Sequence, residues 1–169
     1  MKHWTLALLL GTALLGACST ADDSKTANGS GGTGSGADNG SGGSGRPGHA
    51  VPGSQEDLAQ SAGDRSFFET DRNSLTSQAA ATLDHQAAWL QQYPQVNVWV
   101  AGNCDERGTE EYNLALGQHR ANADRDYLVA HGVQRSRIET ISYGKSRPID
   151  AASTPEAWAQ NRNAITSVR

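Results

Sequence analysis

Cysteine is nearly absent from this chain, and so are the short motifs by which many enzymes bind metals or nucleotides. Only Cys18 and Cys104 occur in 169 residues, which excludes a disulfide framework and a paired CxxC zinc site. HExxH and a glycine-rich phosphate loop are also missing, and His85, His119 and His131 lack the spacing of metal ligands. We therefore expect no metal, no cofactor and no catalytic residue.

Basic charge is scarce as well. The chain has 14 Lys and Arg against 18 Asp and Glu, a net charge of -4 at pH 7. No stretch of basic residues could follow a phosphate backbone. Nucleic acid is therefore not an expected partner.

Long apolar runs are missing too, and the only candidate is the short run Trp4–Leu15. It is shorter than the roughly 20 apolar residues that a membrane-spanning helix needs. The segment Leu15-Gly16-Ala17-Cys18 resembles a lipobox, so residues 1–17 are predicted to be a lipoprotein signal peptide and Cys18 the lipidated N-terminus. Ser19 resembles the outer-membrane sorting preference. The alternative is an ordinary secretory signal peptide followed by a chance cysteine.

The next segment has too little apolar surface to fold. Half of the residues from Asn28 to Gly45 are glycine, mixed with small polar residues. Such a composition does not offset the entropy lost on ordering. Residues 18–63 are therefore predicted to be the lipidated cysteine and a disordered Gly/Ser-rich tether. The alternative is a spacer with no function of its own.

Residues 64–169 have the length and patterning of one small domain. A helix is predicted from about Leu75 to Gln92, because Ala79, Leu83, Ala87 and Leu90 recur at helical spacing. The element order β-α-β-α-β-(α)-β predicts an α/β fold, an α+β sandwich with helices on one face of a small mixed sheet. The other expected elements are strands at Phe67–Glu69, Val96–Ala101, Ile138–Ser142 and Ala164–Val168, and helices from Thr109 to about His131, closed by Gly132, and from Thr154 onward.

The helix that begins at Thr109 is expected to bury an apolar face. Leu114, Ala121 and Leu128 are seven residues apart, and Tyr112 and Leu116 extend the same face.

The loop before this helix is the most informative segment. Asp105 follows the strand Val96–Ala101 in a charged turn, Thr109 is a good N-cap, and Arg120 lies on the helix. A carboxylate beside an arginine would suit a ligand with both an amine and a carboxylate. Spacing alone does not bring them together, since Arg120 lies about 16 Å along the helix from its cap. The alternative is that Asp105 caps turn amides and Arg120 makes a surface ion pair.

The segment GNCDERGTEEYNLALGQHRANA, which begins at Gly102, resembles the OmpA-like peptidoglycan-binding domain family and within it the peptidoglycan-associated lipoproteins (Pal). The resemblance extends from about Phe67 to the C-terminus and includes Asn161–Ala164. It implies that Asp105 accepts a hydrogen bond from the ammonium of the meso-diaminopimelate in a stem peptide. It also implies that Arg120 makes a two-pronged contact with a carboxylate of the same residue. The other positions that the resemblance places at the ligand are Phe68, Glu69, Arg107, Thr109, Asn113 and Leu116.

Five positions depart from the family pattern. Asn103 stands in place of His, Cys104 of Thr or Ala, and His119 of Arg; Asp124 stands where an apolar residue is usual, and Asn163 in place of Arg. None of them removes Asp105 or Arg120.

The resemblance implies a non-enzymatic lipoprotein of the outer membrane that faces the periplasm. It would bind peptidoglycan and tether the membrane to the wall within the Tol-Pal system of envelope integrity and cell division, with TolB as a partner. One alternative is a wall-binding OmpA-like lipoprotein outside the Tol system. Another is a peptidoglycan hydrolase, for which Cys104 with His119 or His131 would be the only candidate groups.

Overall fold

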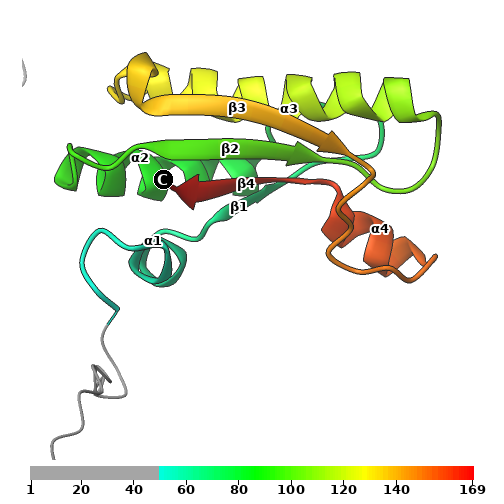
Figure 1. Ribbon diagram of the computed structural model, residues 1–169, viewed down its shortest axis with the longest axis horizontal. Coiled ribbons are helices and arrows are strands. Elements are labelled where there is room, and N and C mark those ends of the chain that lie inside the picture. Colours follow the sequence, from blue (N-terminus) through cyan, green and yellow to red (C-terminus); the bar gives the residue numbers. More distant parts are fainter. Residues whose placement is uncertain (1–49) are drawn as a thin grey trace, which may run out of the picture. The chain divides into compact units, whose positions relative to one another are not determined.

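A computed structural model describes residues 50–169; the predicted signal peptide, Cys18 and the tether up to residue 49 lie outside the described residues. Within this part of the chain no helix is both long and apolar enough to cross a membrane. Figure 1 shows the elements, which follow in the order α1 (Gln55–Ser61), β1 (Arg65–Phe67), α2 (Ser77–Gln92), β2 (Val98–Asn103), α3 (Glu110–Ala130), a 3-10 turn (Arg135–Arg137), β3 (Ile138–Gly144), α4 (Pro155–Asn161) and β4 (Asn163–Val168).

The four strands form one mixed sheet in the order β1-β4-β2-β3. β4 pairs antiparallel with both β1 and β2, whereas β3 pairs parallel with β2. The parallel pair needs a crossover connection, and α3 supplies it. α2 and α3 lie on the same side of the sheet (Figure 1), so the predicted fold class, with helices on one face of a mixed sheet, is confirmed.

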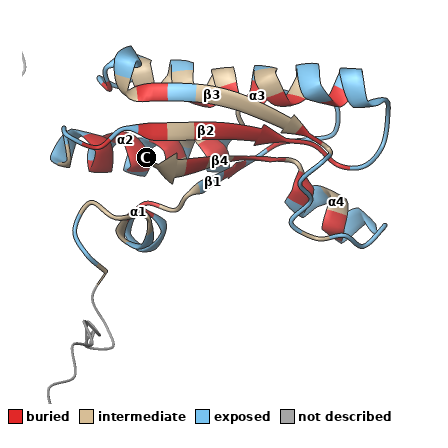
Figure 2. Ribbon diagram, viewed as in Figure 1, coloured by how far each residue is buried: buried red, intermediate tan, exposed pale blue. Residues whose placement is uncertain are grey.

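The predicted apolar stripe of α2 is the centre of the core. Thr76 caps this helix by accepting from the backbone N–H of Ala79, and the helix ends at Tyr93, the residue before Pro94, because proline disfavours helix there. Leu83 and Leu90 are fully buried together with Val98 and Val100 of β2. Figure 2 shows β2 and the inner sides of both helices as buried.

β2 and α3 pack backbone against backbone. A Cβ atom added to Gly102 would lie 1.8 Å from the carbonyl oxygen of Gly117, so only glycine fits at this crossing. α3 begins as predicted, with Thr109 accepting from Tyr112 N at 3.2 Å. This close contact places the end of β2, and the loop that follows it, beside the first turns of α3.

Several boundaries differ from the sequence prediction: β2 covers Val98–Asn103 rather than Val96–Ala101, and β3 extends to Gly144 rather than Ser142. Gln55–Ser61 forms α1, which lies in the predicted tether, and its Leu58 is fully buried in the core. The folded part therefore begins before residue 64, because one leucine and tertiary contacts stabilise a helix with no apolar repeat. β1 covers Arg65–Phe67 rather than Phe67–Glu69; Phe68 already lies beyond the paired strand, although its ring is buried.

The predicted apolar face of α3 is wrong in its first half. Tyr112 and Leu114 are 48% and 40% exposed. The residues buried on this helix are instead largely polar or small: Asn113, Gly117, Arg120, Ala121, Asp124 and Leu128. The cause is the tight backbone crossing, which leaves no room for large side chains there.

Candidate functional site

Asp105 follows the end of β2 and lies in a cleft between the segment after β1, the loop after β2 and the first turn of α3. Cys104 N donates to Gly144 O at 2.8 Å, which fixes the start of the loop against β3. Only 9% of the Asp105 side chain is exposed. A cavity of about 340 Å³ opens beside it and is lined by Thr70, Asp71, Asp105, Arg107, Gly108 and Tyr112.

Two arginines neutralise Asp105. Arg107 approaches it in a fork, with Nε 3.0 Å from Oδ1 and Nη2 2.7 Å from Oδ2, and Arg162 Nη1 lies 3.3 Å from Oδ2. Burial by itself would raise the pKa of Asp105, but the hydrogen bonds from Arg107 and Arg162 outweigh it and hold the pKa below its usual value. Asp105 is therefore an anion whose oxygens are already occupied by guanidinium groups.

Arg107 links this loop to α4. Its guanidinium carbon lies 4.5 Å from the centre of the Trp158 ring, a cation–π distance. Trp158 in turn donates from its indole nitrogen to Glu106 Oε1 at 3.0 Å. Lys145 Nζ donates to Gly108 O at 2.7 Å from the other side of the loop. Arg107 is nevertheless 44% exposed and has room to change its position.

Arg120 lies below the surface rather than in the cleft. It is 1% exposed, and four of its five N–H groups have protein partners. Its donors reach the backbone carbonyls of Arg72, Asn103 and Glu69 at 2.8–3.0 Å and Cys104 Sγ at 3.4 Å. No ion pair between Arg120 and Asp105 is found among the described residues; both line one small closed hollow.

Arg120 thus holds the segment Glu69–Arg72 over the cleft. Its guanidinium also lies 5.2 Å from the centre of the Phe68 ring, which is buried. The family resemblance implies instead that the Arg120 guanidinium is free to bond a ligand carboxylate. In this geometry a ligand would reach Arg120 only if the segment Glu69–Arg72 moved.

The remaining predicted site residues surround the same cleft in different roles. Asn113 is buried and donates from Nδ2 to Arg107 O at 2.8 Å and to Thr109 O at 3.1 Å, so it shapes the loop. Thr109 caps α3. Leu116 is half-buried and lines the closed hollow with Asp105. The Glu69 side chain is exposed, in the segment after β1.

Arg162 is a site residue that the sequence argument did not assign. It bonds to Asp105 and donates from Nε to Phe68 O at 3.1 Å, which joins the loop after β2 to the end of β1. Its position was visible only as part of the segment Asn161–Ala164, which carried the family resemblance without pointing to a role.

Two departures from the family pattern are partners of each other. Asn103 Nδ2 donates to Asn163 Oδ1 at 2.8 Å, and both residues are buried. Two amides form a complementary neutral pair at this place, so neither polar side chain is left without a partner.

The groups required by the hydrolase alternative do not meet. Cys104 is 3% exposed, its thiol donates to Asn113 O, and burial raises its pKa, so it stays protonated. His119 is exposed, and His131 contacts Tyr127 and Asp84 at the far end of α3. Within residues 50–169, no group of three or more His, Cys, Asp or Glu could hold a metal ion.

Comparison with known proteins places this geometry in a family. A model described as the OmpA family matches residues 67–162. A peptidoglycan-associated lipoprotein of Rhizobium meliloti (strain 1021) is 53% identical over 119 residues, which is 70% of this chain and 68% of the relative. One from Mesorhizobium japonicum is 52% identical over 121 residues, 72% of each chain.

Solved structures agree. The crystal structure of the peptidoglycan-associated lipoprotein from Burkholderia pseudomallei is 40% identical with a TM-score of 0.61, covering 63% of this chain and 90% of that one. The C-terminal domain of Helicobacter pylori MotB has a TM-score of 0.59 at 21% identity, with 63% and 84% covered, and shows a shared fold alone. The chain belongs to the OmpA family, in the group of the peptidoglycan-associated lipoproteins.

Proposed function

We propose that this chain binds peptidoglycan non-covalently at Asp105 and thereby attaches the outer membrane to the cell wall. One observation carries the proposal: a nearly buried carboxylate at a cavity edge, within bonding distance of Arg107 and Arg162. A ligand end with one ammonium and one carboxylate matches this arrangement of charges. The meso-diaminopimelate of a stem peptide carries both groups, and the relatives are named for an association with peptidoglycan.

Binding at this site is an exchange of partners. The ligand ammonium takes the place of Arg107 on Asp105, because the carboxylate oxygens are already occupied in the free protein. Arg107 is exposed enough to leave, and with Arg162 it then faces the ligand carboxylate. Arg120 supports the exchange from below by holding the segment Glu69–Arg72.

The site is a binding site rather than a catalytic one. Hydrolysis of the wall would need an activated nucleophile or a pair of carboxylates tuned as acid and base. The Cys104 thiol is buried with a raised pKa and bonds to Asn113 and Arg120, with no histidine next to it among the described residues.

Membrane attachment rests on the lipobox and on the relatives' names as lipoproteins, and the Tol partnership rests on the family resemblance alone. Lipid on Cys18 would anchor the chain in the outer membrane with the domain in the periplasm, and the tether would give the domain reach. TolB is the proposed protein partner. Co-purification of TolB with the protein would support this, and its absence would favour a wall-binding lipoprotein outside the Tol system.

The wall-binding proposal is tested with purified sacculi. Asp105→Asn keeps the size of the side chain and removes its charge, so the ligand ammonium would be buried without a counter-charge. Losing one partner of a buried charge pair across an interface costs about 2–5 kcal/mol, so sacculus binding should fall at least about thirtyfold. The matched control is Asp126→Asn, because Asp126 also pairs with two arginines, Arg125 and Arg135, but is exposed on α3.

Competition identifies the chemistry. A stem tripeptide that ends in meso-diaminopimelate should displace the wild-type protein from sacculi. The same tripeptide with lysine in place of diaminopimelate should displace it poorly, because that side chain ends in an ammonium without a carboxylate. A folded Asp105→Asn protein, verified by thermal melting, that binds sacculi as well as Asp126→Asn does would overturn the site.

A further inference from the structure

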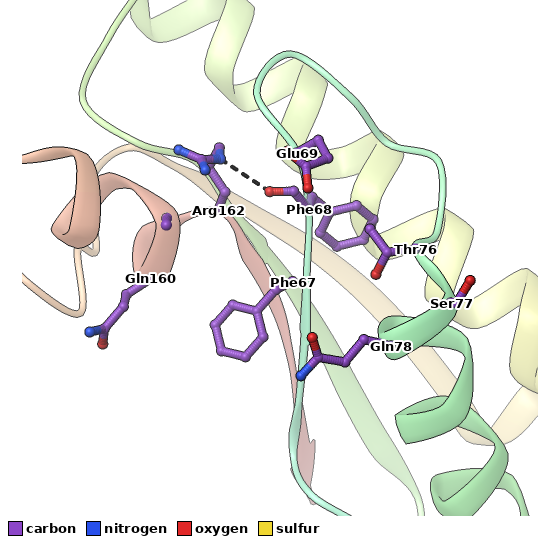
Figure 3. Close-up of a pocket in the computed structure, with 9 residues that line it drawn as sticks. Phe67, Phe68, Glu69, Thr76, Ser77, Gln78, Gln160 and Arg162 are labelled. Carbon is purple, nitrogen blue, oxygen red and sulfur yellow. Dashed lines mark hydrogen bonds between the residues drawn. The ribbon is translucent and has the colours of Figure 1, made fainter.

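A larger hollow lies next to the Asp105 site. Its volume is about 530 Å³, within the range of roughly 300–1,000 Å³ that small-molecule pockets occupy. It is formed by the end of β1, the start of α2 and the end of α4 (Figure 3), and its lining residues are Phe67, Phe68, Glu69, Thr76, Ser77, Gln78, Ala159, Gln160 and Arg162.

Arg162 joins this hollow to the Asp105 site. It lines the hollow, its Nη1 lies 3.3 Å from Asp105 Oδ2, and its Nε bonds to Phe68 O (Figure 3). A ligand held at Asp105 that continues past Arg162 therefore enters the hollow. The two spaces form adjacent parts of one binding surface.

The groups that line the hollow away from Arg162 are uncharged. Within residues 50–169, the side-chain amides of Gln78 and Gln160 and the hydroxyl of Ser77 have no hydrogen-bond partner in the protein, and all three residues are exposed. An amide offers two donors and two acceptor sites, and a hydroxyl offers one donor and two. The charged side chains, Glu69 and Arg162, lie near each other (Figure 3), and Arg162 also contacts Asp105.

An aromatic ring stands among these polar groups. Phe67 is 42% exposed, and its ring lies between Gln160 of α4 and Gln78 of α2 (Figure 3). An exposed phenyl ring flanked by free amides suits a ligand that has an apolar C–H face and hydroxyl or acetamido groups at its edge. A charged peptide segment would find no counter-charge at this end of the hollow.

We propose that this hollow holds an N-acetylated sugar of the glycan strand, while Asp105 holds the stem peptide of the same ligand. The proposal rests on the proposed function and adds to it a second subsite with its own chemistry. Phe67 stacks on the sugar ring, and Gln78, Gln160 and Ser77 bond to its hydroxyl and acetamido groups. The occupant is the sugar to which the stem peptide is attached, because the ligand would run from its diaminopimelate at Asp105 past Arg162 to that sugar in the hollow.

Two soluble ligands test the proposal: a stem tripeptide that ends in meso-diaminopimelate, and the same tripeptide attached to its N-acetylglucosamine–N-acetylmuramic acid disaccharide. Wild-type protein should bind the disaccharide-peptide more tightly, by roughly three- to tenfold for one aromatic contact. Phe67→Ala and Gln160→Ala should each reduce that ratio toward one and leave affinity for the sugar-free peptide unchanged.

Ile149→Ala is the matched control, since Ile149 is 39% exposed and lies outside the hollow; it should keep the wild-type ratio. Asp105→Asn should weaken both ligands alike. A wild-type ratio of one, or a ratio that Phe67→Ala leaves intact, would overturn the sugar subsite and leave the Asp105 site standing. Failure of wild type to bind either ligand would instead overturn the proposed function.

Discussion

The buried carboxyl of Asp124 should make the stability of the fold fall as the pH rises from about 4 to about 7. Asp124 lies on α3, is 1% exposed, and accepts one hydrogen bond, from Ser66 Oγ of β1 at 2.5 Å. Its Oδ1 atom has no partner within the described part of the chain. Burial raises the pKa of Asp124 from 3.8 to about 7, although the Ser66 hydrogen bond opposes this.

The direction follows from proton binding. Between about pH 4 and pH 7 the folded protein keeps the Asp124 proton, whereas the unfolded chain has lost it, so each rise in pH favours unfolding. The contribution is fully present below pH 3.8 and is lost as the pH passes about 7. Each unit of pKa shift changes the free energy of unfolding by about 1.4 kcal/mol. The shift from 3.8 to about 7 therefore corresponds to up to about 4 kcal/mol of stability.

Urea unfolding of wild type and Asp124→Asn at intervals from pH 4 to pH 8 measures this contribution. Other groups act in the opposite direction, because the pKa of Asp105 is lowered and its contribution is lost in acid. The difference between the two proteins isolates Asp124, since asparagine cannot lose a proton. The variant should gain stability relative to wild type as the pH rises. Asp126→Asn, on the same helix but exposed, should show no such gain. Equal pH profiles for wild type and Asp124→Asn would refute the reasoning.

Three further predictions concern stability and are checked together by thermal and urea unfolding. Gly102→Ala should destabilise the domain by about 1–3 kcal/mol or more, because the added Cβ would lie 1.8 Å from Gly117 O. A loss of less than about 0.5 kcal/mol would mean that β2 and α3 can move apart at little cost. Thr109→Ala should cost about 1 kcal/mol through loss of the α3 cap, and an unchanged midpoint would contradict the capping role. Asn103→Ala should cost about 1–3 kcal/mol, because Asn163 Oδ1 loses its buried donor. The double variant Asn103→Ala/Asn163→Ala should lose less stability than the sum of the two single losses, because the two amides bond to each other.

The elements that the sequence predicted well are those with local signals. The leucine and alanine repeat of α2, the threonine caps at Thr109 and Thr154, and the glycine at Gly132 all lie within a few residues of the structure that they determine. Gly132 has φ of +92°, a conformation that glycine adopts without strain. These signals need no tertiary information, so the element order could be predicted from the sequence.

The errors have a common physical cause, which is packing between segments that are distant in the sequence. Ser66, a polar residue, points inward because its hydroxyl donates a hydrogen bond to Asp124. The sequence prediction instead took the apolar pair Phe67–Phe68 as the start of the strand and so placed β1 two residues too late. Leu114 is exposed because the helix approaches β2 through Gly117. Apolar periodicity cannot detect either contact.

The same limit applies to the candidate site. The position of Asp105 at the end of β2 was predictable, because strand, turn and cap follow one another in the sequence. Its partners were not. Arg162, which bonds to Asp105, comes from the end of α4. Arg120 instead donates its hydrogen bonds to backbone carbonyls of the segment after β1. Which arginine meets Asp105 is decided by loop packing, and the assignment of ligand contacts to these residues stays a prediction.

The paired state of Asp105 in the free protein has a consequence for how an anchor of this kind would work. An ammonium that displaces Arg107 exchanges one charge-assisted contact for another, so the net gain of each binding event is smaller than the contact itself. Individual attachments would then be reversible. Under the proposed function, firm attachment would come from many copies that bind one wall, since linked binding events add to a total far above a single affinity. Because individual copies would dissociate and rebind while others stay bound, the membrane could remain attached to a wall that is being cut and extended.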